Sequence, residues 1–406
     1  MGSLTVRLKP GRDKATRGRH PWLFSGAIAS SKGDTKAPIA QVLAHDGSVL
    51  GSGFHSPGAQ LRVRLLASPE ESIGRALFEE RLRTAMELRR ELLPESTSGY
   101  RLLNAEGDGL PGWTVDRFGQ VLVSQITSSG LEALRSQAYA ALQGLLPGLP
   151  ILQINELGPR RRENLPVENE VVAGDLPEEA AFLEHGFNFL AELGGGQKTG
   201  FYLDQRANRR RVEDLAKDRS VLDLFAHTGA FGLYALRGGA RSVVHVESSR
   251  RQVDRGRVHY ELNRELLGGD EPSVEWVAKD VFEDLRRRSD SYGMVICDPP
   301  PLARRRADRD KAARAYKDLN RLALGRVEPG GLFLTFCCSS AIDTRLFRQI
   351  LFSSALEAGV DLALLSPLGA APDHPVSVYH PEGEYLKGWL GVVRGAATPP
   401  LPDAKR

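Results

Sequence analysis

Two adjacent cysteines end the hydrophobic run "GGLFLTFCCSSAID" (residues 330–343), which is typical of a buried strand. The chain of 406 residues contains only one other cysteine, Cys297. Since neighbouring strand residues point to opposite faces, only one of Cys337 and Cys338 can face a given ligand. The pair therefore predicts either one nucleophilic thiol beside one core residue, or two small core residues.

Acidic residues follow three other short hydrophobic runs. Glu247 ends "SVVHVE" and stands 24 residues after Asp223, Asp280 follows "SVEWVAK", and Asp298 lies in "CDPP". In a parallel sheet these strand ends share one edge, where ligands bind. A carboxylate after the second strand can accept both ribose hydroxyls, and one after the third can accept an adenine amino group.

The turn "DLFAHTGAFG" (residues 223–232) indicates which nucleoside ligand fits. It contains Gly229 and Gly232 but lacks the G-x-G-x-x-G pattern that lets a backbone approach a pyrophosphate. A loose glycine turn, two acids and the D-P-P sequence together favour S-adenosylmethionine over NAD. The simpler alternative is that Glu247 and Asp280 only cap helices.

The elements that position these residues are expected to form an α/β, doubly wound, Rossmann-like sheet. Strands alternate with helical segments over residues 193–396, which indicates βα units. Residues 1–70 show short alternating runs typical of a small β domain, residues 71–95 a linking helix, and residues 96–192 a compact α+β middle domain. We expect a disordered tail at residues 397–406.

The composition limits the class of protein, its cellular compartment and its partners. The chain is 41% hydrophobic without an apolar run of membrane-spanning length, and three cysteines make no disulfide framework, so a cytoplasmic protein without membrane contact is expected. The net charge of +3 permits nucleic-acid binding without requiring it. Four arginine-rich clusters make a phosphate-tracking surface plausible; they lie at residues 11–20, 158–164, 207–213 and 302–317. No histidine spacing indicates a metal site.

Many motifs in order resemble one family over nearly the full length. They are "GRHPWLFSGAI" (18–28), "YRLLNAEGDGLPGWTVDRFG" (100–119), "GQKTGFYLDQRANR" (196–209), "DLFAHTGAFG", "CDPP", "YKDLN" (316–320), "LTFCCSS", "DHPV" (373–376) and "PEGEYLKG" (381–388). The chain resembles the RlmI-type 23S ribosomal RNA cytosine-5 methyltransferases. That resemblance implies an N-terminal PUA domain, an RNA-binding β module, before a class I S-adenosylmethionine-dependent methyltransferase domain.

The resemblance also implies roles for the cofactor-binding residues. Residues near the methionine end of the cofactor would be Lys198, Thr199, Gln205 and Arg206, with Arg206 on the carboxylate. Residues lining the rest of its pocket would be Asp223, Phe225, Thr228, Gly229, Glu247, Asp280 and Asp298.

For catalysis, Cys338 aligns with the family's nucleophile and Asp298 would hold the target base. Carbon 5 of cytosine becomes nucleophilic when a thiolate adds at carbon 6, which explains the need for a cysteine with a lowered pKa. Cys337 and Cys297 are then core residues. No cysteine stands shortly after Asp298, where many RNA cytosine-5 methyltransferases have a second cysteine, so the base that removes the carbon-5 proton is unassigned.

Candidate contacts to the 23S ribosomal RNA substrate are Pro299, Pro300, Arg304, Arg305, Arg19 and His20. The prolines would receive a base that has left its stack. Pro301 and Leu302 replace the lysine and phenylalanine that usually follow D-P-P in the family, which affects the placement of the nucleotide. Alternatives left open are a guanine-N7 methyltransferase, a non-catalytic RNA-binding assembly factor and, for the assembly state, a homodimer.

Overall fold

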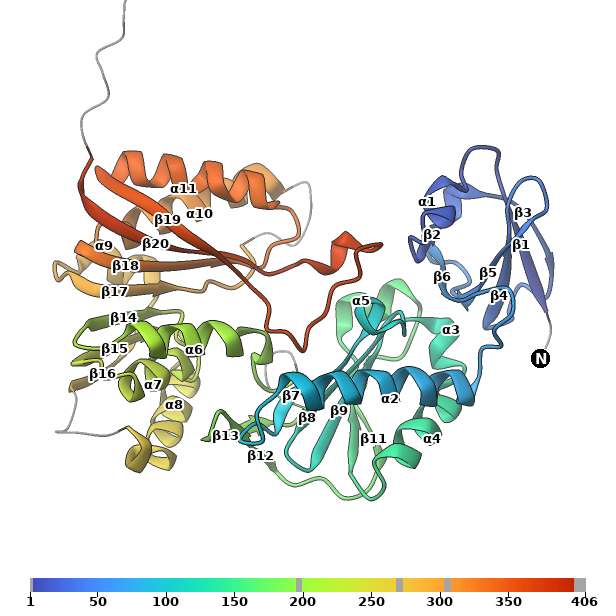
Figure 1. Cartoon of the computed structure of the whole chain (residues 1–406), viewed down its shortest axis with the longest axis horizontal. Helices are drawn as coiled ribbons and strands as arrows, with labels where there is room; N and C mark the ends of the chain where they lie inside the picture. Colours follow the sequence, from blue (N-terminus) through green and yellow to red (C-terminus); the bar gives the residue numbers. More distant parts are fainter. Residues whose placement is uncertain (1–2, 195–198, 268–272, 303–307, 398–406) are drawn as a thin grey trace, which may run out of the picture. The chain divides into compact units, whose positions relative to one another are not determined.

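The computed structural model describes residues 3–194, 199–267, 273–302 and 308–397. It divides into two compact units (Figure 1). Unit 1 comprises residues 1–204 and 372–383, and unit 2 comprises residues 205–371 and 384–406. The segment 372–383, which the sequence placed in the methyltransferase domain, thus belongs with the N-terminal half. Within the described residues no helix is both long and apolar enough to cross a membrane.

The first part of unit 1 is a six-stranded sheet in the order β2-β6-β5-β4-β1-β3. Its elements are β1 (Leu4–Leu8), α1 (Lys14–Arg17), β2 (Trp22–Phe24), β3 (Ile28–Gly33), β4 (Ile39–Leu43), β5 (Val49–His55) and β6 (Leu61–Ala67). Alternate residues Leu4, Val6 and Leu8 of β1 point into a small core, as the period of two in the sequence requires. This sheet is the small N-terminal β domain that the sequence predicts.

The second part of unit 1 is a five-stranded sheet in the order β11-β10-β9-β8-β7. Its elements are α2 (Arg75–Leu92), β7 (Gly99–Asn104), β8 (Trp113–Phe118), β9 (Val121–Ile126), α3 (Ser129–Glu132), α4 (Arg135–Leu145), β10 (Ile151–Gln153), α5 (Leu157–Arg162), β11 (Glu170–Ala173) and the hairpin β12 (Glu179–Glu184) with β13 (Phe187–Glu192). Helix α2 is more than a linker, because Phe78, Leu82 and Ala85 are buried in the core of this sheet.

Unit 2 is built on a seven-stranded sheet in the order β16-β15-β14-β17-β18-β20-β19. Its strands are β14 (Ser220–Leu224), β15 (Ser242–Glu247), β16 (Ser273–Ala278), β17 (Tyr292–Cys297), β18 (Val327–Cys337), β19 (Val360–Gly369) and β20 (Lys387–Ala396). Strands β14 to β18 pair in parallel, whereas β20 pairs antiparallel with both β18 and β19. An antiparallel pair needs no crossover helix, and the connection from β19 to β20 contains only the short 3-10 helix η6 (Pro381–Gly383).

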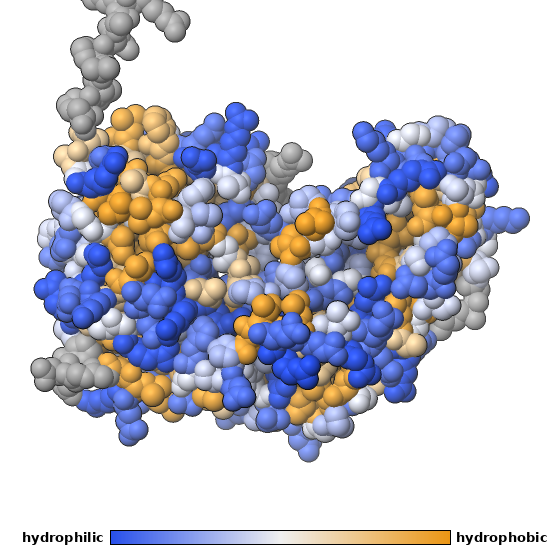
Figure 2. Space-filling model, in the orientation of Figure 1, coloured by the Kyte–Doolittle hydropathy of each residue, from blue (hydrophilic) through white to orange (hydrophobic). Residues whose placement is uncertain are grey.

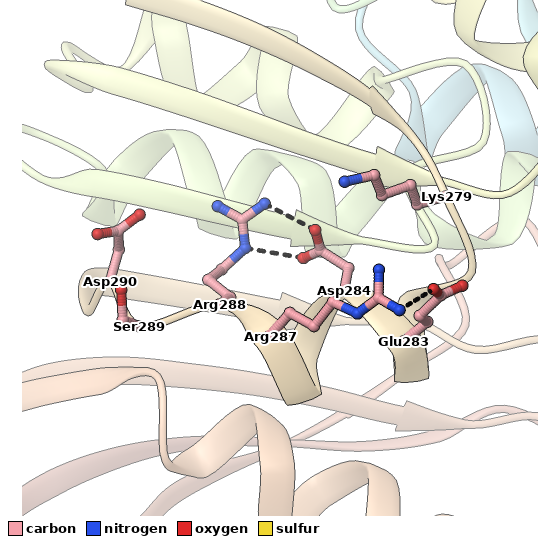
Figure 3. Close-up of a pocket in the computed structure, with 7 residues that line it drawn as sticks. All are labelled: Lys279, Glu283, Asp284, Arg287, Arg288, Ser289 and Asp290. Carbon is pink, nitrogen blue, oxygen red and sulfur yellow. Dashed lines mark hydrogen bonds and ion pairs between the residues drawn. The ribbon is translucent and has the colours of Figure 1, made fainter.

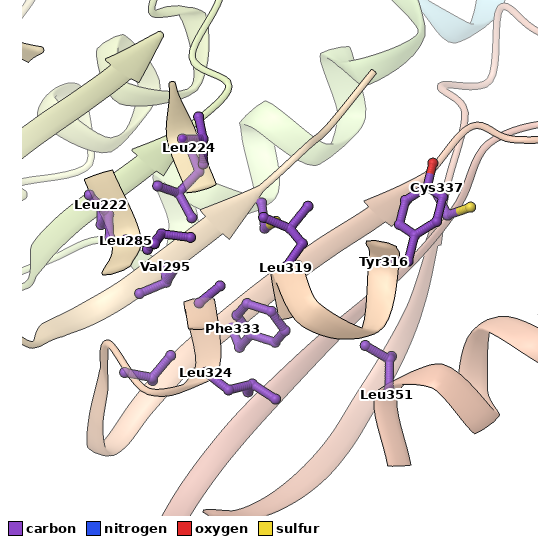
Figure 4. Close-up of a cluster of buried hydrophobic side chains, with 14 of the residues drawn as sticks. Leu222, Leu224, Leu285, Val295, Tyr316, Leu319, Leu324, Phe333, Cys337 and Leu351 are labelled. Atoms are coloured by element: carbon purple, nitrogen blue, oxygen red, sulfur yellow. The ribbon is translucent and has the colours of Figure 1, made fainter. Parts of the chain in front are cut away.

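Helices cover both faces of this sheet (Figure 1). They are α6 (Arg206–Leu215), α7 (Ala230–Arg237) and α8 (Arg250–Leu262) on one face, and α9 (Val281–Arg287), α10 (Arg309–Leu324) and α11 (Thr344–Ala358) on the other. Figure 4 shows the core under the second group, where side chains from β14, β17 and β18 meet α10 and α11. On the outside, Figure 2 shows hydrophobic surface over α11 and β19, where Phe352 and Leu365 are exposed.

The other face of the sheet contains an aromatic stack of one buried ring and one half-buried ring. His245 of β15 lies on the Trp276 ring, with centroids 4.0 Å apart and planes 17° apart, and its Nδ1 is 3.0 Å from Asp223 Oδ2. A Cβ added at Gly232 would lie 2.0 Å from the imidazole, and one added at Gly256 would lie 2.4 Å from the indole. Helices α7 and α8 can approach the sheet only because these two positions are glycine.

Replacing Gly232 with alanine should therefore lower the free energy of unfolding by about 1–3 kcal/mol. The imidazole cannot move aside, because it is fully buried between Asp223 and Trp276. Gly325→Ala is the matched control, since its added Cβ would meet nothing closer than 3.4 Å. Urea unfolding should show a loss for Gly232→Ala and almost no change for Gly325→Ala; equal effects would contradict the close packing.

Candidate functional site at the carboxyl edge of the unit 2 sheet

The order of the strands makes β14 and β17 the point where the chain reverses direction across the sheet. Strand β14 is flanked by β15 and β17, whose helical connections lie on opposite faces. Ligands of doubly wound sheets bind outside the carboxyl ends of the strands at such a point. The segments that follow β14 and β17 are residues 225–229 and the D-P-P turn, and the backbone N–H of Asp298 faces the Leu224 carbonyl oxygen at 3.5 Å. The predicted site thus has the expected place in the fold.

The loop after β14 has an unusual backbone. Phe225, His227 and Gly229 all have positive φ angles, of 59°, 51° and 72°. Left-handed residues that alternate with ordinary ones turn successive N–H groups toward one side of a loop. Thr228 is 2% exposed, and its hydroxyl has no hydrogen-bond partner among the described residues. A buried hydroxyl usually has a partner, so this loop fits a polar ligand.

Glu247 holds this loop in place. Its Oε2 accepts the backbone N–H of His227 at 3.0 Å, and its Oε1 accepts the backbone N–H of Ser249 at 2.9 Å and the Ser248 hydroxyl at 3.1 Å. Each carboxylate oxygen can accept two hydrogen bonds, so Oε2 keeps capacity for a ligand hydroxyl. Glu247 does not itself cap a helix, because Ser249 is the N-cap of α8.

Asp280 and Asp223 have structural contacts. Asp280 is the exposed N-cap of α9, where its Oδ1 accepts the backbone N–H of Glu283 at 3.0 Å. Asp280 therefore caps a helix, as the simpler alternative predicts. The cap uses Oδ1, so it does not exclude a ligand on Oδ2. Asp223 is 1% exposed and contacts His245, so its carboxylate lies within the packing under the loop.

Gln205 connects the start of α6 to the D-P-P turn. Its Nε2 donates to Asp298 Oδ2 at 2.9 Å, and its Oε1 accepts from Asn208, which also donates to the Gly369 carbonyl at 2.9 Å. Because Oε1 is taken by Asn208, the amide can present only its N–H to Asp298. Arg206 follows at the first position of α6 and is 2% exposed, a buried cation that fits a carboxylate ligand.

The two adjacent cysteines lie in different surroundings. Cys337 is fully buried beside Tyr316 in the core (Figure 4), and burial raises the pKa of its thiol. Cys297 is also fully buried, and burial raises the pKa of its thiol strongly, with Asp298 adding to the effect. Cys338 instead is partly exposed, with its Sγ 3.8 Å from the carbonyl oxygen of Pro299. The alternation expected from the sequence is present: one sulfur lies in the core and the other beside the D-P-P turn.

A lysine that the sequence left without a role lies beside this strand end. Lys387 is the cross-strand partner of Cys337 and is 7% exposed. Its Nζ donates to the carbonyl oxygen of Ser339 at 3.2 Å and to that of Tyr385 at 2.9 Å. The ammonium group therefore holds the backbone that follows Cys338. The sequence signal that could have indicated this role is a single lysine within the hydrophobic stretch "YLKGWLGVV".

Lys198, Arg304 and Arg305 lie outside the described residues. Thr199, Arg19 and His20 belong to unit 1, where the Thr199 hydroxyl donates to Asp116 and His20 contacts Glu382. In the D-P-P turn, Pro299 is buried whereas Pro300 and Pro301 are exposed.

A different concavity lies along α9 and is lined by charged residues (Figure 3). Its arginines pair with acids on their own helix, Arg287 with Glu283 at 2.9 Å and Arg288 with Asp284 at 2.7 Å. Such pairs stabilise the helix surface and leave little charge for a ligand. Among the described residues, no three His, Cys, Asp or Glu side chains are grouped to hold a metal ion.

Known proteins match this chain over most of its length. The family model for S-adenosylmethionine-dependent methyltransferases matches residues 132–377, and that for PUA-like domains matches residues 6–68. Proteins named ribosomal RNA large subunit methyltransferase I from Pseudoalteromonas atlantica and Shewanella amazonensis are each 38% identical to it, covering 96% of this chain and 99% and 100% of their own.

An S-adenosylmethionine-dependent methyltransferase structure from Streptococcus mutans has a TM-score of 0.80 at 22% identity, covering 96% of this chain and 100% of its own. A methyltransferase solved with S-adenosylhomocysteine has a TM-score of 0.81 at 23% identity, covering 97% of this chain and 100% of its own. These two structures share the fold.

Glu247→Gln should loosen the loop after β14. Glu247 accepts two backbone N–H groups, one on each carboxylate oxygen. A glutamine has only one acceptor oxygen, so the amide NH₂ of the variant would point at one of these N–H donors. We expect a loss of about 1–3 kcal/mol of stability and faster amide hydrogen exchange at residues 225–229. Ser248→Ala is the control, because it removes one exposed hydroxyl that donates to Oε1 but leaves both backbone N–H groups on the carboxylate. Unchanged exchange in Glu247→Gln would show that the carboxylate does not hold the loop.

Proposed function

Because the chain belongs to the RlmI-type family of S-adenosylmethionine-dependent methyltransferases with an N-terminal PUA domain, we propose that it methylates carbon 5 of a cytosine in 23S ribosomal RNA. Ribosomal RNA methylation by S-adenosylmethionine follows from the names and coverage of the relatives. The cytosine and the covalent route rest on one observation, the partly exposed Cys338 thiol beside the D-P-P turn.

The described residues suit the cofactor, which supplies an electrophilic methyl group when bound. Arg206 would hold the amino-acid carboxylate, and Glu247 would accept the ribose hydroxyls with the capacity left on Oε2. The buried Thr228 hydroxyl would gain the partner it lacks among the described residues. Asp280 would accept the adenine amino group, and Phe225 and Gly229 would form the loop around the nucleoside. Thr199 and Lys198 stay predicted neighbours of its methionine end.

The thiolate of Cys338 would attack carbon 6 of the cytosine, which makes carbon 5 able to take the methyl group. Removal of the carbon-5 proton then lets the carbon–sulfur bond break and returns the thiolate. Asp298 would share a proton with N3 of the base as the thiolate adds and would accept the amino group of the base, and Gln205 fixes its position through Oδ2. Pro299 and Pro300 would border the base, and Arg304 and Arg305 would bind nearby phosphates.

Cys338→Ala should reduce methyl transfer about 10³-fold or more, because the variant has no nucleophile to activate carbon 5. Binding of S-adenosylmethionine, measured by calorimetry, should change little. Transfer is followed with labelled cofactor on RNA from a strain lacking the enzyme, and the product is identified by bisulfite sequencing.

Cys337→Ala is the matched control one residue away. It should cost about 1 kcal/mol of stability, since a small buried group is removed, and retain methyl transfer. Full activity in Cys338→Ala would refute the covalent route and favour guanine-N7 methylation, which needs no thiol. RNA binding without any transfer by the wild-type protein would favour a non-catalytic assembly factor.

Lys387→Met tests whether the buried ammonium group assists the thiolate. Lys387 opposes the rise in the pKa of Cys337 and is bonded to the carbonyl of Ser339, next to Cys338. Removing a nearby positive charge disfavours the thiolate, so the pH at which kcat is half-maximal should move upward by roughly one unit. Lys387→Arg should largely restore the profile. A lower kcat at every pH without a shift would show only a structural role for Lys387.

A further inference from the structure

Unit 1 contains a concavity that none of the proposed catalytic residues line. Its lining residues are Gly11, Arg12, Lys14, Ala15, Gly18 and His20 from the loops around α1, together with Val378 and Tyr379. The two groups are more than 350 residues apart in the sequence but belong to the same compact unit. The concavity therefore exists only because the segment 372–383 returns to the N-terminal half.

Buried polar contacts fix the first part of this segment. The Asp373 carboxylate is fully buried and accepts the backbone N–H of Arg101 at 2.8 Å, and its carbonyl accepts Arg89 at 2.7 Å. The Pro375 carbonyl accepts Asn104 at 2.9 Å and lies so close to Gly107 that an added Cβ would be 1.9 Å away. Charged hydrogen bonds of this kind are strong and specific in direction. Val378 and Tyr379 are thus carried by an anchored segment.

Aromatic and charged contacts fix the second part of the segment against the β domain. The His380 ring meets Trp22 edge to face with centroids 4.4 Å apart, and the Trp22 indole N–H donates to Glu106 at 2.7 Å. His20 Nδ1 accepts the backbone N–H of Trp22, so its Nε2 carries the proton and donates to Glu382 at 3.2 Å. These contacts use His20 within the protein, which leaves the cations of the α1 loops to meet a ligand.

The lining is positive and carries an accessible ring. Arg12 and Lys14 contribute positive charge, and no carboxylate lines the concavity. The nearest acid in sequence, Asp13, is bonded to Arg17 at 2.6 Å, which lowers the pKa of Asp13. Val378 is 87% exposed and Tyr379 is 44% exposed, and the Arg19 guanidinium lies 5.4 Å from the centroid of the Tyr379 ring.

We propose that this concavity binds one unpaired nucleotide of the RNA substrate, with its base on Tyr379 and Val378 and its phosphates on Arg12 and Lys14. Proteins bind single-stranded RNA by combining an exposed aromatic ring with nearby cations. A base inside an A-form helix is already stacked on its neighbours, so an RNA duplex could not use the ring. Gly11 and Gly18 have no side chains, which lets the sugar-phosphate chain approach the backbone.

This inference rests on the proposed function only in taking ribosomal RNA as the substrate. It assigns RNA recognition to residues 378 and 379, in a segment that leaves and re-enters the sequence of the catalytic unit. It also gives Arg19 a definite task, which is to support the Tyr379 ring through a cation–π contact.

The test measures binding and turnover separately. Full-length Tyr379→Ala should bind a fluorescent single-stranded 12-nucleotide oligoribonucleotide about tenfold more weakly than wild type. Tyr379→Trp should retain binding, and a duplex of the same sequence should bind equally to all three proteins. With large-subunit ribosomal RNA, Tyr379→Ala should raise KM while kcat at saturating RNA stays unchanged.

The contribution of the two cations to RNA binding is measured separately, by the salt dependence of the affinity. Arg12→Gln combined with Lys14→Gln should reduce the slope of log K against log salt by about 0.7 for each lost phosphate contact. Lys36→Gln is the matched control, because Lys36 is an exposed cation of the same domain outside the lining. The proposal would be overturned if the Tyr379 variants and the Arg12/Lys14 double variant kept wild-type affinity for RNA and the wild-type salt slope. It would also be overturned if these variants still bound RNA but lost binding to an acidic peptide. Absence of methyl transfer by the wild-type protein would instead refute the proposed function, while the oligonucleotide measurement still decides on the pocket.

Discussion

The alternation of side chains along β18 separates two otherwise identical thiols. Cys337 is enclosed by Tyr316 and the helices α10 and α11, where burial keeps it protonated. Cys338, one residue further, lies beside the carbonyl of Pro299. A slip of one residue in the pairing of β18 with β17 and β20 would exchange the two sulfurs. Several neighbours fix that register, including the Thr335 hydroxyl on Asn320 at 2.6 Å and Lys387 on the Ser339 carbonyl.

The loop after β14 depends in a similar way on packing beneath it. Asp223, His245 and Trp276 form a rigid group under α7 and α8, and glycines at 229, 232 and 256 let the helices and the loop lie directly on it. The positive φ angles of Phe225 and His227 carry a conformational cost that this packing and the Glu247 carboxylate offset. The loop after β14 is thus held in shape by its surroundings.

Much of this arrangement could be predicted from the sequence, because strand ends and alternation are local properties. The α/β fold, the N-terminal β domain and the place of Asp298 at the end of β17 follow from short patterns. Alternation predicts that the two adjacent cysteines differ in burial, and the family resemblance indicates Cys337 as the buried one. The antiparallel end of the sheet, the hydrogen bond from Gln205 to Asp298 and the location of residues 372–383 depend on contacts between distant segments. No spacing in the sequence indicates which of two compact units such a segment joins.

The location of residues 372–383 has a consequence for the chain as a polymer. The backbone passes between the two units three times, near residues 204, 371 and 383. Because the chain crosses three times, each unit holds together the two ends of a chain segment that belongs to the other unit. A segment whose ends are held together gains less conformational entropy when its unit unfolds alone. A nick between residues 204 and 205 would leave residues 372–383 on the C-terminal fragment, no longer linked by the chain to Arg101, whose backbone N–H donates to Asp373. Folding of the two units should accordingly be coupled, although each has its own hydrophobic core.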